Sequence, residues 1–154
     1  MISTDMQIAV PQADDLDKVF AVAELVHAGH DTTTEIAQEM GMVGRQGLYY
    51  SSAAEILRLV DIDRHHNVTL TQMGESYVKA DALKRETLRR QLVFNTPIVK
   101  HVAAELGINH PSYEKHAHIF DDMLFVQDAI EELGYAKETA LRRAFTLKAW
   151  VNGA

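Results

Sequence analysis

The sequence predicts a mostly α-helical protein built from two related helical units. Apolar residues recur at helical spacing along most of the chain, glycines follow several of these segments, and the second half repeats the pattern of the first. The extended runs are few and short, and they lie near residue 65. With 154 residues, 47% of them hydrophobic, the chain suits one medium domain or two very small units that share a core.

Two helices are predicted near the start of the chain. Residues 15–28 place apolar side chains on one helical face, and Gly29 follows as a helix stop. Thr32 and Glu35 have the spacing of a capping box, which predicts a short helix ending at Gly41. The side chains expected to be buried are Leu16, Val19, Phe20, Ala23, Val26, Ile36, Ala37 and Met40.

A third helix, a hairpin and a longer helix are expected next. Residues 44–60 predict a helix whose buried stripe is Leu48, Ser52, Ile56 and Val60. Two short extended runs, 61–63 and 68–70, are joined by the polar residues 64–67, which indicates a hairpin. Thr71 is suited to cap a further helix over 72–94 with a break near Asp81.

The second half resembles the first when the numbering is shifted by 93 residues. It contains predicted helices at 97–107, 121–134 and 135–151, with an irregular segment at 108–120. The matching positions are Ala37 with Ile130, Met40 with Leu133, Gly41 with Gly134, Leu48 with Leu141 and Leu57 with Trp150. Such a match indicates an internal repeat.

This order of elements is typical of a winged helix, in which the second helix of a helix-turn-helix pair docks into the DNA major groove. We therefore expect a tandem winged-helix arrangement with a wing in the first unit alone. A flexible lead-in would cover residues 1–14, the first winged-helix unit 15–80, and the connecting helix with the second helix-turn-helix unit 81–154.

Candidate DNA contacts begin at the start of the third helix. Arg45, Gln46 and Tyr49 occupy the end that meets base edges first in such docking, and Arg and Gln pair with guanine and adenine. The alternative is that Arg45 is a solvated turn residue, and that one of Tyr49 and Tyr50 is buried.

The hairpin and the connecting helix supply candidate phosphate contacts. Arg64 and His65 lie at the expected wing tip, with an exposed polar turn as the alternative. Arg85 and Arg89 share one face of the connecting helix, flanked by Lys84 and Arg90. A solvated helix face explains this basic run equally well.

The last predicted helix is the more basic of the two candidate recognition helices. Its candidate contacts are Lys137, Thr139, Arg142 and Arg143. Acidic residues just upstream, at 121–122 and 131–132, provide the alternative of internal ion pairs. If a single helix binds DNA, the sequence favours this one over the third helix.

Other classes of protein have little support. The pairs His27/His30 and His116/His118 lack the spacing of a catalytic zinc site, so no metal and no cofactor are expected. No phosphate-binding glycine loop, nucleophile elbow or cysteine is present, so no enzyme is expected. Without cysteine, a secretory signal or a membrane span, the chain is expected to be cytoplasmic.

Two stretches resemble a known class of DNA-recognition module. "RQGLYYSSAAEILRLV" with "VTLTQMGE", and later "ETALRRAFTLKAWV", are similar to the winged-helix region attached to some type II restriction enzymes and related mobile-element proteins. "TLTQMGESYVKADALKRETLRRQL" is more faintly similar to a regulatory region of ABC-transporter ATPase subunits. The first resemblance implies that Arg45, Gln46, Thr139, Arg142 and Arg143 face DNA. Lys137 stands where a capping Ser or Asp would be expected.

The leading hypothesis is a non-catalytic protein that binds double-stranded DNA, as a regulator or as the recognition partner of a nuclease or ATPase. The alternative is a winged-helix module for protein interaction or oligomerisation, including a homodimer. The net charge of −7 favours the alternative, because DNA-binding domains usually carry a basic balance.

Overall fold

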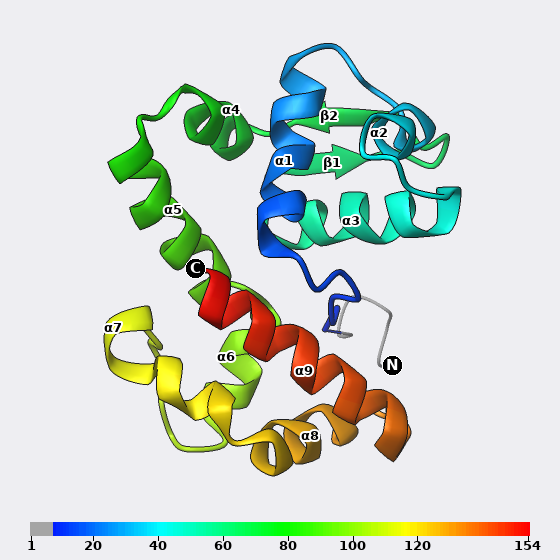
Figure 1. The fold of residues 1–154 in the computed structure, drawn as a ribbon. Coiled ribbons are helices and arrows are strands. Elements are labelled where there is room, and N and C mark those ends of the chain that lie inside the picture. The colour runs from blue at the N-terminus through cyan, green and yellow to red at the C-terminus, as the bar shows by residue number, and fades with distance from the viewer. Residues whose placement is uncertain (1–7) are drawn as a thin grey trace.

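The computed structural model describes residues 8–154, which form a mostly helical fold with one small antiparallel hairpin (Figure 1). The elements of the first half are α1 (Leu16–His27), α2 (Thr33–Glu39), α3 (Gly44–Ile56), β1 (Val60–Ile62), β2 (Val68–Leu70) and α4 (Gln72–Lys79). Those of the second half are α5 (Ala82–Phe94), α6 (Pro97–Ala104), α7 (Tyr113–His116), the 3-10 helix η2 (Ala117–Asp121), α8 (Met123–Glu131) and α9 (Lys137–Gly153). The mostly α-helical class and the hairpin are confirmed.

Side-chain caps define most of the helix starts, as the sequence predicts. The Thr71 hydroxyl accepts a hydrogen bond from the Gly74 amide, and the Asp81 carboxylate does the same for Lys84. Thr32 caps α2, but the Glu35 carboxylate accepts from the Asp31 amide, one residue before the position of an ideal capping box. The predicted break near Asp81 is confirmed, because Ala80 has an extended backbone.

The hairpin is held against the residues that precede α2. Val60 pairs with Leu70 and Ile62 with Val68 in the antiparallel register. An isolated antiparallel bridge joins Thr32 to Asn67, and the Val68 amide donates to the Asp31 carbonyl at 2.7 Å. The segment before α2 therefore extends the two-stranded sheet by one short pairing.

Small residues form the contact between α2 and α3. Gly47 lies so close to Ala37 that an added Cβ would stand 2.2 Å from the Ala37 Cβ. The buried face of α3 is Gly47, Ser51, Ala53 and Ala54. Of the predicted stripe, Leu48, Ser52 and Ile56 are half-buried, and Val60 is buried but lies in β1, because α3 ends at Ile56. The closest packing is formed by small side chains, which let the two helices approach.

Helix α9 runs diagonally between the first unit and the lower helices, and its end lies beside α5 (Figure 1). The segment before α1 packs along it. The indole Nε1 of buried Trp150 donates to the Ala13 carbonyl at 2.6 Å, and the Thr146 hydroxyl donates to the Asp14 carboxylate at 2.5 Å. Val10 and Ala13 are buried, so residues 8–14 are not the flexible lead-in that the sequence predicts. Residues 1–7 of that prediction lie outside the described residues.

The segment predicted to be irregular contains α7 and η2, so this prediction is wrong for residues 113–120. Ser112 starts α7 by accepting from the Lys115 amide, while its own amide donates to Nδ1 of His116. Within residues 8–154, no helix combines the length and the apolar character that crossing a membrane requires.

Candidate nucleic-acid interface

The start of α3 presents polar side chains to solvent. Arg45 and Gln46 are exposed, and the side chain of neither makes a hydrogen bond or ion pair with another residue in the described part of the chain. The Arg45 guanidinium carbon lies 6.0 Å from the Tyr49 ring centre. Tyr49 and Tyr50 are both half-buried, and Tyr50 is the one that packs against the core. Tyr50 also accepts a hydrogen bond from the Asp15 amide through its hydroxyl.

The hairpin tip is an ordered turn that exposes Arg64 and His65. The Asp63 carboxylate accepts from the His65 amide at 2.8 Å, from the Asn67 amide at 2.9 Å and from the Asn67 side chain at 3.1 Å. The pKa of Asp63 is lowered, mainly by the hydrogen bond from the Asn67 backbone amide and secondly by the one from the Asn67 side chain, because both donors stabilise the charged carboxylate. Arg64 is therefore held on a turn that its neighbours keep in one conformation.

On α5, the two arginines predicted to bind phosphate, Arg85 and Arg89, form hydrogen bonds within the protein instead. Arg85 donates to the Glu24 carboxylate and to the carbonyls of Tyr77 and Val78, and so closes the end of α4. Arg89 donates to Asp17 at 2.6 Å and to the Gly153 carbonyl at 3.1 Å, with its guanidinium 4.8 Å from the Phe20 ring centre. We therefore exclude Arg85 and Arg89 from the candidate interface. Sequence spacing groups them correctly on one face, but the partners come from distant parts of the chain.

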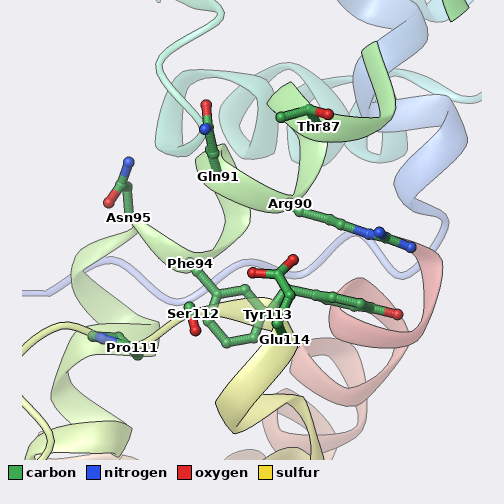
Figure 2. Close-up of a pocket in the computed structure, with 9 residues that line it drawn as sticks. All are labelled: Thr87, Arg90, Gln91, Phe94, Asn95, Pro111, Ser112, Tyr113 and Glu114. Atoms are coloured by element: carbon green, nitrogen blue, oxygen red, sulfur yellow. The ribbon is translucent and has the colours of Figure 1, made fainter. Parts of the chain in front are cut away.

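Arg90 borders a pocket between α5 and α7 (Figure 2). The pocket has a volume of about 230 Å³ and is lined by Thr87, Arg90, Gln91, Phe94, Asn95, Pro111, Ser112, Tyr113 and Glu114. Figure 2 shows Arg90 extended beside Tyr113, whose ring centre lies 4.2 Å from the guanidinium carbon. The amides of Gln91 and Asn95 point away from Tyr113, so the polar groups do not converge on one point.

Helix α9 has fewer free basic groups than its composition indicates. Lys137 and Arg142 are exposed, whereas Arg143 is half-buried and donates to the Val10 carbonyl at 3.1 Å. Half-buried Thr139 lies 3.5 Å from an Arg142 nitrogen. The N-cap of α9 is Ala136, which offers no side-chain acceptor, so Lys137 is the first helical residue and not a cap.

The shift of 93 residues relates α3 to α9 position by position. Val43 and Ala136 are their N-caps, neither with a capping side chain, and Gly41 and Gly134 both have positive φ. All five positions buried at the α3 contact have buried counterparts in α9: Gly47 with Ala140, Ser51 with Ala144, Ala53 with Thr146, Ala54 with Leu147 and Leu57 with Trp150. This agreement in burial supports the internal repeat. It also places Glu138 at the position of Arg45.

The charge of the two halves differs. Residues 15–80 carry ten acidic and five basic side chains, whereas residues 81–154 carry ten of each. Several arginines of the second half form hydrogen bonds within the protein. The equal number of acidic and basic residues in this half therefore overstates the positive charge that is available to a partner. The exposed bases of the first half are fewer, but Arg45 and Arg64 make no internal ion pair within the described chain.

A histidine–glutamate cluster was not predicted from the sequence. One donor atom each of His101, Glu105 and Glu132 lies within 4.8 Å of the other two. The His101 ring nitrogen Nε2 is 2.8 Å from the Ala129 carbonyl, at the end of α8. Hydrogen bonding to the Glu105 side chain raises the pKa of Glu132. The sequence signal was the four-residue spacing of His101 and Glu105, but nothing in it placed Glu132 beside them.

Of the histidine pairs considered for metal binding, His30 and His116 make contacts within the protein, and His27 and His118 are exposed. His30 lies 3.4 Å from Glu39, and His116 accepts from the Ser112 amide. The first contact joins the α1–α2 loop to the end of α2, and the second lies within the start of α7.

Comparison with protein-family models gives a match over residues 18–153 to a domain of unknown function, DUF7226. Comparisons with curated proteins and with solved structures return no match.

Proposed function

We propose that this chain, which belongs to the DUF7226 family of unknown function, binds double-stranded DNA without catalysing a reaction. The start of α3 would lie in the major groove and the hairpin tip would contact the adjacent backbone. Such a protein would act as a regulator or as the recognition partner of a separate effector, with a nuclease or an ATPase as candidate partners.

The element order supports a winged-helix interpretation of the first unit. Helix α1 is followed by the bridging residue Thr32, then α2, α3 and the β1–β2 hairpin. A winged helix places a short strand between its first two helices and a hairpin after the third. The matching burial of α3 and α9 supports a second helix-turn-helix pair, formed by α8 and α9.

The observation that carries the proposal is that the side-chain donors of Arg45 and Gln46 have no hydrogen-bond partner within residues 8–154. In a chain whose arginines on α5 are bonded internally, Arg45 and Gln46 keep their donors available to a partner. Their position at the start of α3 is where a recognition helix meets base edges. Exposed Arg64 adds a candidate phosphate contact on the hairpin. We therefore favour α3 over α9, reversing the preference that composition alone supports.

A salt series of binding to duplex DNA tests this proposal. Wild-type protein is expected to bind random duplexes with micromolar affinity that weakens steeply as salt rises. Arg64→Ala should reduce the slope of log affinity against log salt by about 1, since one phosphate contact is lost. Lys100→Ala, which removes an exposed charge from α6, serves as the matched control and should leave the slope unchanged. Absence of binding at low salt would overturn the proposal.

A second candidate function is protein interaction or oligomerisation. Leu124 on α8 and Phe145 on α9 are 71% and 54% exposed, and such side chains favour a protein contact. Under this alternative, the wild type would self-associate or bind a partner protein, and Leu124→Ala or Phe145→Ala would weaken that association. Light scattering over a concentration series distinguishes it from DNA binding, for which Arg45→Ala and Arg64→Ala are the informative variants.

A further inference from the structure

Val43 is an exposed apolar residue at the point where α2 turns into α3. Val43 is 69% exposed, and it lies just before the candidate DNA contacts Arg45 and Gln46. It occupies the N-cap of α3 with an extended backbone, and valine offers no acceptor for the free amides of the first turn. Neither core packing nor capping explains a valine at this position.

The other helix starts show that this choice is unusual within the chain. Six helices of residues 8–154 begin at a side-chain cap that accepts a hydrogen bond: Asp15, Thr32, Thr71, Asp81, Ser112 and Asp122. The N-caps of α3 and α9 are apolar instead, Val43 and Ala136. These two helices are the candidate recognition helices, so the apolar N-cap coincides with the proposed interface.

The surroundings of Val43 leave room for a partner. A Cβ added to Gly41 or to Gly44 would meet no atom within 4 Å, so the turn on both sides of Val43 is open. Arg45 follows two residues later with its guanidinium exposed. Val43 and Arg45 are thus both exposed at the start of α3.

We propose that Val43 is a base-contacting residue that packs against the C5 methyl group of a thymine next to the base pair bound by Arg45. This inference rests on the proposed DNA binding. In the major groove, the thymine methyl is the apolar feature that distinguishes this base, and small apolar side chains contact it. An exposed valine beside an arginine combines the two kinds of major-groove contact, apolar for thymine and bidentate for guanine.

Replacing thymine by uracil tests the contact, because this change removes the methyl group and keeps the base pair. Duplexes with a random core are first enriched by binding to the wild-type protein. Each thymine of the enriched site is then replaced singly by uracil, and affinity is measured by fluorescence anisotropy. Uracil at one position should weaken wild-type binding about threefold to fourfold, since roughly one buried methyl group is lost.

The variant Val43→Ala completes the cycle. It should bind the thymine duplex about threefold to fourfold more weakly than wild type and should no longer distinguish uracil from thymine. Leu83→Ala, which removes an exposed apolar side chain from α5, is the matched control and should keep the discrimination. Circular dichroism verifies that each variant is folded.

The outcomes separate this inference from the proposed function. DNA binding that no uracil substitution weakens, or an enriched site without thymine, would overturn the role of Val43 and leave DNA binding intact. Discrimination that persists in Val43→Ala would overturn it as well. Failure of the wild type to bind any duplex at low salt would overturn the proposed function, and this inference with it.

Discussion

Substitution of Gly47 by alanine is expected to force α2 and α3 apart. The new Cβ would stand 2.2 Å from the Ala37 Cβ and 2.9 Å from its Cα. Both are carbon atoms fixed by the backbone, so no side-chain rotation relieves the clash. Ordinary contact begins near 3.4 Å, and the helices must therefore separate by about 1.2 Å at this point.

Two opposing effects set the size of the change in stability. Overpacking of a tight core contact costs about 1–3 kcal/mol. Alanine in a helix interior is favoured over glycine by about 1 kcal/mol. The net loss is expected at about 0–2 kcal/mol, which lowers the Tm of a domain of this size by up to roughly 8 °C.

Urea unfolding followed by circular dichroism measures this effect, with Gly44→Ala as the matched control. Gly44 lies on the same helix, but a Cβ there meets no atom within 4 Å, so its substitution should be neutral or stabilise by up to about 1 kcal/mol. Equal stability of the two variants, or a Gly47→Ala protein more stable than wild type, would refute the close contact of α2 with α3.

Three further predictions concern other parts of the fold. Trp150→Phe should destabilise by about 2–3 kcal/mol in urea unfolding, because the buried Ala13 carbonyl loses its donor and the core loses volume; a loss below about 0.5 kcal/mol would contradict this. Asp63→Ala should lower the Tm at pH 7, and the difference from wild type should shrink on acidification. The pKa of Asp63 is lowered in the folded state, so its ionised form stabilises the fold at pH values above the unfolded-state pKa, and this stability is lost as the carboxylate is protonated. A Tm difference that stays constant with pH would count against this explanation. Glu132→Gln should instead raise the Tm at pH 7, because the raised pKa of Glu132 means that its ionisation destabilises the folded state. The gain should vanish below about pH 4, where Glu132 is protonated in the folded and the unfolded protein. A gain that persists at that pH would refute the explanation.

Helix starts and stops were predictable because their signals are local. Thr71 and Asp81 act as caps on residues three positions away, and the glycine at 41 adopts the positive φ that a helix stop requires. Each of these interactions spans fewer than five residues, so the sequence around it contains the information. The hairpin was predictable for the same reason.

The packed face of α3 and the role of the arginines on α5 were not predictable. A search for large apolar side chains finds Leu48 and Ile56, but the closest packing forms where side chains are smallest, at Gly47. Arg85 and Arg89 form a basic stripe in sequence, yet their partners Glu24 and Asp17 lie 61 and 72 residues away. No local sequence pattern distinguishes an arginine that is available to bind phosphate from one that is hydrogen-bonded to a carboxylate distant in sequence.

The segment before α1 gives the chain an unusual requirement during folding. Its contacts with α9 join residues separated by 132 to 137 positions, as between Asp14 and Thr146 or Ala13 and Trp150. Contacts of such high sequence separation carry a large loop-closure entropy and form late in folding. On the ribosome, Ala13 and Asp14 emerge early but have no partner until α9 has been synthesised. Until then the residues before α1 lack the α9 guanidinium, hydroxyl and indole contacts that hold them in the complete fold.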